Sequence, residues 1–319
     1  MKHLATIGLL VLLALTACQP QPEDTYRPTP YELPTPLFFP SQNNIPADNP
    51  MTEEGVALGD LLFHEANGCA QCHKREYSYE GGPEATLEHL GTTHTMLPLI
   101  NLAWSTTGLG WQSQVPTLED MVYAAYTDPL EINMDTAEVV RSLRQSDTYP
   151  ELFRKAFGTD EITFVRVGKA IAQYVRSLVF ANSKFDRYLH GEEQLTQDEL
   201  NGYRLFITDN GADCFHCHGG GSNALFSTHL RYNNGLDAQA EGTFKAPTLR
   251  NIALTAPYMH DGRFRTLDEV IDFYSEGVQY SDAISPLMHH VMEGGVRLTP
   301  DEKRQLKAFL NTLTDDELH

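Results

Sequence analysis

Two short stretches decide the fold of this chain: CAQCH at residues 69–73 and CFHCH at residues 214–218. Both have the spacing C-x-x-C-H, which is the attachment pattern of c-type haem. Two thiols three positions apart reach the two vinyl groups of one porphyrin, and the adjacent histidine is then held beneath the iron as its proximal ligand. The sequence therefore predicts two covalent haem c groups, attached through Cys69, Cys72 and His73 and through Cys214, Cys217 and His218.

Two other uses of these four cysteines compete with haem attachment. Two C-x-x-C pairs could together hold one tetrahedral zinc ion, and in an oxidising compartment each pair could form a disulfide. Haem attachment is favoured because a histidine follows each pair at once. Both pairs also stand in the same context, with helical periodicity before them and a glycine-rich loop after them.

The fifth cysteine, Cys18, ends a different kind of signal. Lys2 precedes an apolar run at residues 5–17, which has the length of the core of a secretory signal and is too short to span a bilayer. Leu15-Thr16-Ala17-Cys18 resembles a bacterial lipobox, which implies cleavage after residue 17 and lipid attachment to Cys18. An ordinary signal peptide with an incidental cysteine is the alternative. From the lipobox resemblance we expect a lipid anchor on the periplasmic side of a bacterial membrane. Because Gln19 rather than an aspartate follows Cys18, analogy with other lipoproteins favours the outer membrane.

The rest of the chain divides into a tether and two similar halves. Half of the 18 prolines lie in residues 18–50, which predicts a semi-rigid tether whose Leu37-Phe38-Phe39 packs on the folded body. From Thr52 onward apolar residues recur at helical spacing, so we expect an all-α fold. The plan of helix, cysteine pair, loop and later helix occurs twice. It predicts two cytochrome c-like domains, residues 51–190 and 191–319, with one haem each.

Individual helices can be placed from their periodicity and start signals. We expect helices over residues 162–180, from Thr266 with Glu269 as the capping acid, and from Thr299 to the C-terminal region. Two apolar sets should face the core: Val56, Leu58, Leu61, Leu62 and Phe63 before the first cysteine pair, and Val165, Ala172, Val175, Leu178 and Val179 in the longest helix.

The charge balance restricts the partners. With 43 acidic and 23 basic side chains the chain has a formal net charge of −20, which argues against nucleic acid and favours basic or neutral partners. A hydrophobic content of 41% is that of a folded globular protein.

Beyond the haem motifs, the chain resembles the bacterial di-haem cytochrome c peroxidases and their MauG-type relatives. The resemblance runs from about Pro46 to Thr314 and is densest in FKAPTLRNIALTAPYMHDGR at residues 244–263. FDRY at 185–188 and PLE at 129–131 match as well. PADNPMT at 46–52 and the Phe215-His216 insert are similar to the branch linked to methanobactin operons, some members of which oxidise a partner protein.

This resemblance implies roles for the two haems and the residues between them. The haem on His73 would be the peroxide site, and the haem on His218 would store and relay electrons. Trp111 matches the tryptophan between the haems, where an aromatic ring shortens the electron's path. Glu131 matches the distal carboxylate that moves a proton between the peroxide oxygens. A core tryptophan and a plain surface glutamate are the alternatives for these two residues.

Tyr274 is the most informative single position. Fourteen residues after His260, the classical peroxidases have a methionine that ligates the second haem, whereas MauG-type enzymes have a tyrosine, as this chain does. A thioether raises a haem potential, but a phenolate is a hard, anionic donor that stabilises higher iron oxidation states. A core tyrosine is the alternative, and Met259, Met288 and Met292 are other candidate ligands.

The chain also departs from the family pattern. Only His89 and His94 lie near the position of the distal histidine, and neither aligns cleanly, so an open first haem is favoured. Calcium is left open, because the backbone carbonyls of Thr255 and Pro257 match the family's ligands but Thr95 stands where its asparagine would be. The family's glutamine near the peroxide site is replaced by Met121.

Three hypotheses are consistent with these features. The first is an exported peroxidase that reduces hydrogen peroxide with electrons from a small redox protein. The second is a MauG-like enzyme that uses a His/Tyr haem to oxidise a residue of an exported partner protein. The third is a di-haem electron carrier without peroxide chemistry.

Overall fold

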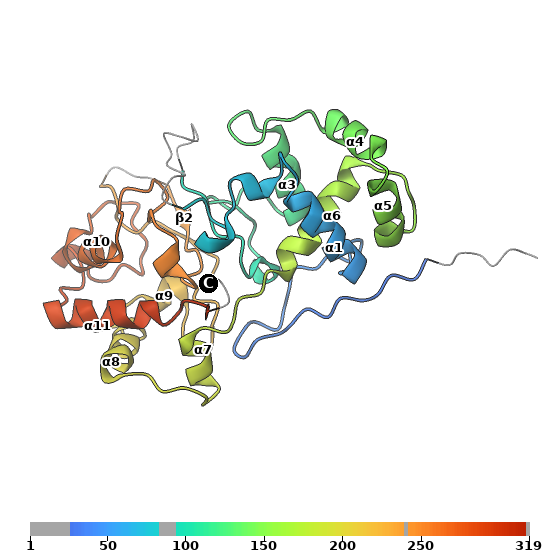
Figure 1. Cartoon of the computed structure of the whole chain (residues 1–319). Coiled ribbons are helices and arrows are strands. Elements are labelled where there is room, and N and C mark those ends of the chain that lie inside the picture. Colours follow the sequence, from blue (N-terminus) through green and yellow to red (C-terminus); the bar gives the residue numbers. More distant parts are fainter. Residues whose placement is uncertain (1–25, 83–93, 239–241, 317–319) are drawn as a thin grey trace, which may run out of the picture.

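A computed structural model describes residues 26–82, 94–238 and 242–316 of the chain. The expected signal peptide (residues 1–17), the expected lipidation site Cys18 and the candidate distal ligand His89 lie outside these ranges. The described chain is mostly helical and forms two lobes that lie side by side (Figure 1). We call residues 53–180 the N-terminal lobe and residues 184–313 the C-terminal lobe. Within the described ranges, no helix combines the length and the apolar character that crossing a membrane requires.

Among the described residues, five helices build the N-terminal lobe: α1 (Glu53–Phe63), α3 (Leu118–Thr127), α4 (Thr136–Gln145), α5 (Tyr149–Phe157) and α6 (Phe164–Ser177). Four of them begin at a threonine or aspartate whose side chain accepts a hydrogen bond from the first turn. Helices α1 and α6 pack closely because α1 has a glycine at the crossing. A Cβ on Gly59 would lie 2.0 Å from the carbonyl oxygen of Ala170.

The part of the C-terminal lobe that the structure describes also has five helices: α7 (Lys184–Leu189), α8 (Gln197–Phe206), α9 (Phe215–His218), α10 (Leu267–Asp272) and α11 (Pro300–Asn311). The expected helix starts at Thr266 and Thr299 are confirmed, and each is a capping box. Helices α8 and α11 again cross at a glycine, since a Cβ on Gly202 would lie 2.0 Å from the carbonyl oxygen of Gln305. Helix α7 packs with this lobe through Phe185, ahead of the expected domain boundary at 190/191.

Shorter elements connect the helices. A two-residue antiparallel ribbon joins β1 (Arg231–Tyr232) to β2 (Phe244–Lys245), so the described chain is mostly rather than wholly helical. Helix α10 runs directly into a π turn over Phe273–Gly277. Single 3₁₀ turns cover Cys69–Gln71, Arg75–Tyr77, Leu102–Trp104, Ile252–Leu254 and Val291–Glu293.

The two lobes have separate hydrophobic cores, and these test the expected apolar faces. Most of the expected residues are buried or packed against a core, but Leu61 is 50% exposed and Val165 is 68% exposed. The expectation was wrong for these two residues. Leu61 lies just beyond the edge of the buried face of α1, next to Leu58 on the helix surface. Val165 lies in the first turn of α6, ahead of the first buried residue, Val167.

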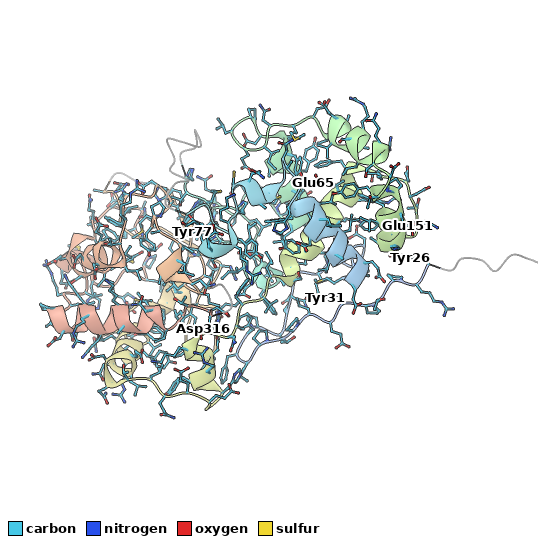
Figure 2. All side chains as sticks on the ribbon, viewed as in Figure 1. Tyr26, Tyr31, Glu65, Tyr77, Glu151 and Asp316 are labelled. Atoms are coloured by element: carbon cyan, nitrogen blue, oxygen red, sulfur yellow. The ribbon has the colours of Figure 1, made fainter. Side chains whose placement is uncertain are left out.

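Residues 26–50 lie along the folded body rather than away from it. In Figure 1 this blue segment runs along the N-terminal lobe and turns back near α7. At its start the hydroxyl of Tyr26 donates a hydrogen bond to a backbone carbonyl of α5 (Figure 2). Of the three apolar residues expected to pack, Phe39 is buried against Trp104 at a centroid distance of 4.9 Å, whereas Leu37 and Phe38 stay largely exposed.

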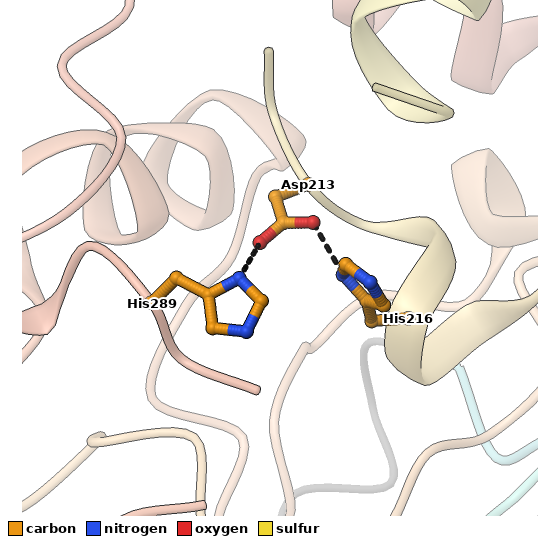
Figure 3. A group of neighbouring side chains, drawn as sticks. All are labelled: Asp213, His216 and His289. Carbon is orange, nitrogen blue, oxygen red and sulfur yellow. Dashed lines mark hydrogen bonds and ion pairs between the residues drawn. The ribbon is translucent and has the colours of Figure 1, made fainter. Parts of the chain in front are cut away.

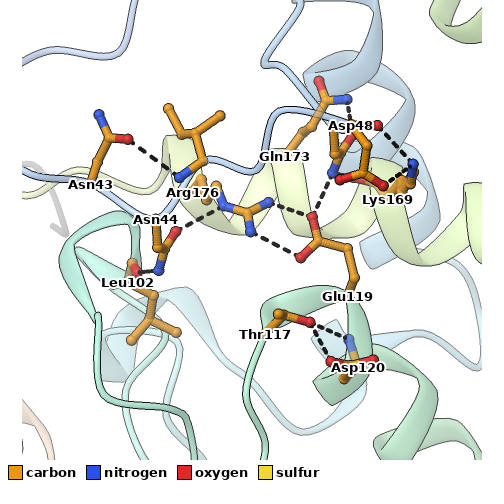
Figure 4. A network of polar contacts seen from close by, with 12 residues as sticks. Asn43, Asn44, Asp48, Leu102, Thr117, Glu119, Asp120, Lys169, Gln173 and Arg176 are labelled. Carbon is orange, nitrogen blue, oxygen red and sulfur yellow. Dashed lines mark hydrogen bonds and ion pairs between the residues drawn. The ribbon is translucent and has the colours of Figure 1, made fainter.

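A buried polar network fixes the same segment to the helices (Figure 4). Arg176 of α6 donates to both carboxylate oxygens of Glu119 at 2.8 and 2.9 Å, and its Nε donates to Asn44 at 3.0 Å. Gln173 donates to Asn49 at 2.8 Å. The segment before α1 is therefore part of the structure that supports the N-terminal lobe.

Candidate functional site

A cavity in the C-terminal lobe gathers the second C-x-x-C-H motif. Its lining is largely apolar and includes Cys214, Cys217, His218 and Tyr274. Both thiols are free, and burial raises the pKa of each to about 12. A covalently attached haem requires two thiols, one imidazole and an apolar wall. The residues of this cavity therefore fit a haem c.

The backbone orients His218 as a ligand. Its Nδ1 lies 3.1 Å from the carbonyl oxygen of Pro247, and a hydrogen bond there places the proton on Nδ1 and leaves Nε2 free for a metal. Burial lowers the pKa of His218 to about 4. The imidazole is therefore neutral at pH 7, which is the form that ligates iron.

Tyr274 lies in the wall of this cavity, on the π turn rather than on the regular helix that was expected to extend through it. Its hydroxyl oxygen accepts a hydrogen bond from Nδ2 of Asn234 at 3.0 Å. Burial raises the pKa of Tyr274, and the hydrogen bond from Asn234 acts in the opposite direction. Ligation by Tyr274 stays a prediction.

The other candidate ligands differ in position. Met259 and Met288 also line the cavity, while Met292 is 77% exposed. Asn234 was missed by the sequence reasoning, because its role depends on a contact with a residue 40 positions away. The sequence Asn233-Asn234-Gly235 signals a turn but does not indicate what the side chain of Asn234 meets.

Trp111 reaches the same cavity from the N-terminal lobe. Its ring is part of the lining and lies edge-on to His260 at a centroid distance of 6.4 Å. Its Nε1 donates to the carbonyl oxygen of Thr95 at 2.7 Å, and its own carbonyl accepts from the backbone of Lys245 at 2.7 Å. Trp111 is thus fixed where the two lobes meet, although its redox role stays a prediction.

Further aromatic rings lie beside Trp111 where the two lobes meet. His260 stacks on Phe244 at 3.7 Å, and both rings line the cavity. The ring of His94 lies 5.7 Å from Phe244 and 5.6 Å from His260. His94 therefore packs toward the second site, which gives no support to it as a ligand of the first haem.

The first C-x-x-C-H motif has a matching arrangement in the N-terminal lobe. Nδ1 of His73 lies 2.6 Å from the carbonyl oxygen of Tyr79, and burial lowers the pKa of His73. Burial raises the pKa of the Cys69 thiol to about 12, and the charge of Glu131 contributes to the rise. Glu131 thus belongs to the electrostatic surroundings of the first attachment cysteine.

Glu131 stands on the loop after α3. Although the residue as a whole is exposed, burial of its carboxyl, together with the charge of Asp128, raises its pKa. Met121, which stands where the resemblance expected a glutamine, packs against the core of the same lobe. The structure thus places Glu131 on the same lobe as His73, while its catalytic role stays a prediction.

Neither alternative for the four cysteines is found. All four are free, and the first cysteine of each pair packs against the core of a different lobe, Cys69 in one and Cys214 in the other. Among the described residues, one group of histidine, cysteine and acidic side chains is placed to share a metal ion, and it contains no cysteine.

The comparisons with known proteins agree with this site. A family model described as "Di-haem cytochrome c peroxidase" matches residues 53–194. The chain is 32% identical to the methylamine utilization protein MauG of Methylorubrum extorquens, over 84% of this chain and 80% of the relative. It is 30% identical to the cytochrome c551 peroxidase of Nitrosomonas europaea, over 86% of this chain and 84% of the relative.

Solved structures are similar as well. The crystal structure of a MauG-like protein associated with microbial copper homeostasis superposes with a TM-score of 0.79 at 32% identity, over 90% of this chain and 97% of that one. The diheme peroxidase BthA from Burkholderia thailandensis E264 superposes with a TM-score of 0.69 at 19% identity, which indicates the same fold.

Proposed function

This chain belongs to the di-haem cytochrome c peroxidase family, and we propose on that basis that each lobe holds one haem c. Hydrogen peroxide is reduced at the N-terminal site, and electrons from a small redox protein reach it by way of the C-terminal site. One observation carries this proposal: the cavity that contains Cys214, Cys217 and His218 is also lined by Trp111 of the other lobe. An aromatic ring in this place shortens the path of an electron between the lobes.

The chain's own residues handle the proton. When bound, the haem supplies the redox chemistry by which hydrogen peroxide, two electrons and two protons give two molecules of water. Glu131 takes the proton from one peroxide oxygen and delivers it to the other, which then leaves as water. Its raised pKa makes its carboxylate a stronger base for taking that proton than the carboxylate of an ordinary glutamate.

The second candidate function is a MauG-like oxidation of a residue on an exported partner protein. The observation that favours it is Tyr274 in the wall of the second cavity, with Asn234 donating a hydrogen bond to its oxygen. A donor in this place stabilises a phenolate, which as an anionic oxygen ligand would lower the potential of the second haem. Such a haem accepts electrons poorly from ordinary donors.

A single experiment separates these functions. Ferric protein is mixed with stoichiometric peroxide while optical and EPR spectra are recorded. One high-spin signal together with a low-spin His/Tyr signal supports the MauG-like function, whereas a methionine–iron charge-transfer band in place of the His/Tyr signal contradicts it. Rapid consumption of peroxide with a reduced small cytochrome supports the peroxidase function. If both haems are low-spin in every redox state and peroxide leaves the spectrum unchanged, the protein is an electron carrier.

We propose that the chain is anchored by a lipid on Cys18 and faces the periplasm. The support is the sequence of residues 1–18 and the described segment from Tyr26, which lies against the folded body. Labelling cells with a palmitate analogue should tag the wild-type protein and leave Cys18→Ala unlabelled. Label on Cys18→Ala, or its absence from both proteins, contradicts the anchor.

We also propose that one calcium ion binds between the lobes. Thr255 and Pro257 would provide backbone carbonyls, and Glu80 offers a carboxylate in place of the asparagine. Glu80 is 3% exposed, and its charge contributes to the raised pKa of Tyr258, the residue after Pro257. The protein as isolated should contain one equivalent of calcium, which Glu80→Ala should lose. Calcium-free protein with unchanged haem spectra would contradict the site.

A further inference from the structure

A cluster of two histidines and one aspartate lies at the second haem-attachment motif, and none of the three was given a role at the haem site above (Figure 3). Asp213 stands between the two rings. Its Oδ1 lies 2.5 Å from Nδ1 of His216, and its Oδ2 lies 3.6 Å from Nδ1 of His289. The rings come from distant parts of the chain, since His216 is on α9 and His289 is on the loop before Val291.

The carboxylate of Asp213 is buried between two histidine rings. The side chain of Asp213 is 6% exposed, and among the described residues its ion-pair partners are these two imidazoles. A buried carboxylate is costly unless a positive charge or a metal ion compensates it. A divalent cation bound between the carboxylate and the two rings supplies a compensating positive charge.

The donor set favours one class of ion. The three ligand atoms, one from each residue, all lie within 4.8 Å of one another. Two imidazole nitrogens and one carboxylate oxygen suit Zn²⁺ and Cu²⁺, whereas Ca²⁺ and Mg²⁺ prefer oxygen ligands alone. Water can complete the coordination.

We propose that Asp213, His216 and His289 form a binding site for one Zn²⁺ or Cu²⁺ ion, distinct from both haem irons. The rings are 24% and 46% exposed, so an ion can enter from solvent. The contact between Asp213 and His216 opens by a few tenths of an ångström when the ion takes the place of the proton between them.

The position of the site gives the ion a consequence for electron transfer. Asp213 directly precedes Cys214, and both Asp213 and His289 line the second cavity. A positive charge there favours the reduced form of a haem attached at Cys214, so the bound ion raises the potential of that haem. This consequence rests on the proposed function, whereas the metal site itself does not.

The test uses untagged, chelator-stripped holoprotein titrated with Zn²⁺ by calorimetry. Wild-type protein should bind one equivalent, and His289→Ala should bind at least about tenfold more weakly. His190→Ala is the matched control, because it removes an exposed histidine of the same lobe that lies outside the cluster. Equal affinity of wild type and His289→Ala, or no stoichiometric binding, overturns the site.

A second readout identifies the ligands. The EPR spectrum of one equivalent of Cu²⁺ should show coupling to two imidazole nitrogens in the wild type and to one in His289→Ala. An unchanged number of nitrogens overturns the assignment. Spectroelectrochemistry with and without Zn²⁺ then tests the potential of the second haem, and a potential that stays constant while Zn²⁺ binds overturns the coupling. Metal binding is measured without peroxide, so its failure is separate from a failure of peroxidase activity.

Discussion

The two lobes share one scaffold and differ in the residues around their attachment motifs. In each lobe two helices cross at a glycine, Gly59 in one and Gly202 in the other, and in each the attachment histidine is oriented by a backbone carbonyl. The cavity at the second motif has Tyr274 and Trp111 in its wall, whereas in the first lobe the charge of Glu131 contributes to the raised pKa of Cys69. The comparison teaches that one scaffold can carry two attachment motifs with different surroundings, and we expect these surroundings to decide the chemistry of each lobe.

The shared scaffold is most easily broken at the two glycine crossings. Gly59→Leu or Gly202→Leu should each destabilise the protein by about 3 kcal/mol, because a side chain would displace the backbone of the facing helix. Chemical denaturation measures this change. Gly168→Ala in α6 is the control: its Cβ would meet its nearest neighbour at 3.4 Å and should leave stability unchanged or slightly raised. Wild-type stability of both leucine variants would contradict the shared crossing.

The difference between the lobes is tested first at Glu131. Glu131→Gln should lower kcat/KM for hydrogen peroxide by about 10²–10⁴-fold, because the amide cannot move a proton, while haem content stays unchanged. Steady-state kinetics with a reduced cytochrome measures it.

Asp128→Asn is the matched control for Glu131→Gln. The negative charge of Asp128 raises the pKa of Glu131, so its removal should lower that pKa. The pH profile of kcat/KM should then shift to lower pH with little loss at its maximum. An equal rate loss in both variants would assign the effect to the loop rather than to the carboxyl.

The second lobe is tested at Tyr274. Tyr274→Met should raise the potential of the second haem by on the order of 100 mV, because a thioether stabilises the reduced iron. Asn234→Leu should leave the ligand in place but raise the pKa of the phenol, since the hydrogen bond from Asn234 lowers it. The low-spin His/Tyr signal should then require a higher pH. An unchanged potential in Tyr274→Met means that Tyr274 is only part of the core.

The smallest expected difference is in the pH dependence of stability. Glu80 is buried, and burial raises its pKa to about 8. In calcium-free protein its contribution to the free energy of unfolding is therefore fully present below about pH 4.5 and is lost as the pH rises through 8. The contribution of Asp186 to stability depends on pH in the opposite direction. Although burial alone would raise its pKa, the guanidinium of Arg250 at 2.7 Å lowers it, so its contribution is present above about pH 4 and lost in acid.

Chemical denaturation of calcium-free protein between pH 3 and pH 9 measures how the free energy of unfolding changes with pH on the acid side and on the alkaline side. Glu80→Gln should flatten the loss on the alkaline side and leave the acid side unchanged. A variant that flattens neither side would show that Glu80 is not the group that titrates.

Local patterns made much of this fold predictable. The spacing C-x-x-C-H located both sites, and the capping pairs Thr266/Glu269 and Thr299/Glu302 correctly marked two helix starts. The pattern was wrong for Leu61 and Val165, because helical spacing does not tell which part of a face meets a neighbour.

Long-range contacts were not predictable in the same way. The carbonyl oxygen of Pro247 lies 29 residues from His218, and the donor to Tyr274 lies 40 residues before it. The pairing of His289 with Asp213 likewise depends on folding, and His289 alone suggests only a surface residue. Such contacts are made by the tertiary structure and leave no period or motif in the sequence.

The π turn after α10 has a consequence for how this family can diversify. A π turn contains one residue more than the α-helical turn it replaces. Loss of one residue from Phe273–Gly277 would restore the regular winding and rotate the adjoining residues by about 100°, so a neighbour of Tyr274 would face the cavity. We expect that a single codon gained or lost here exchanges the side chain that lies in the wall of the cavity without any other residue being substituted.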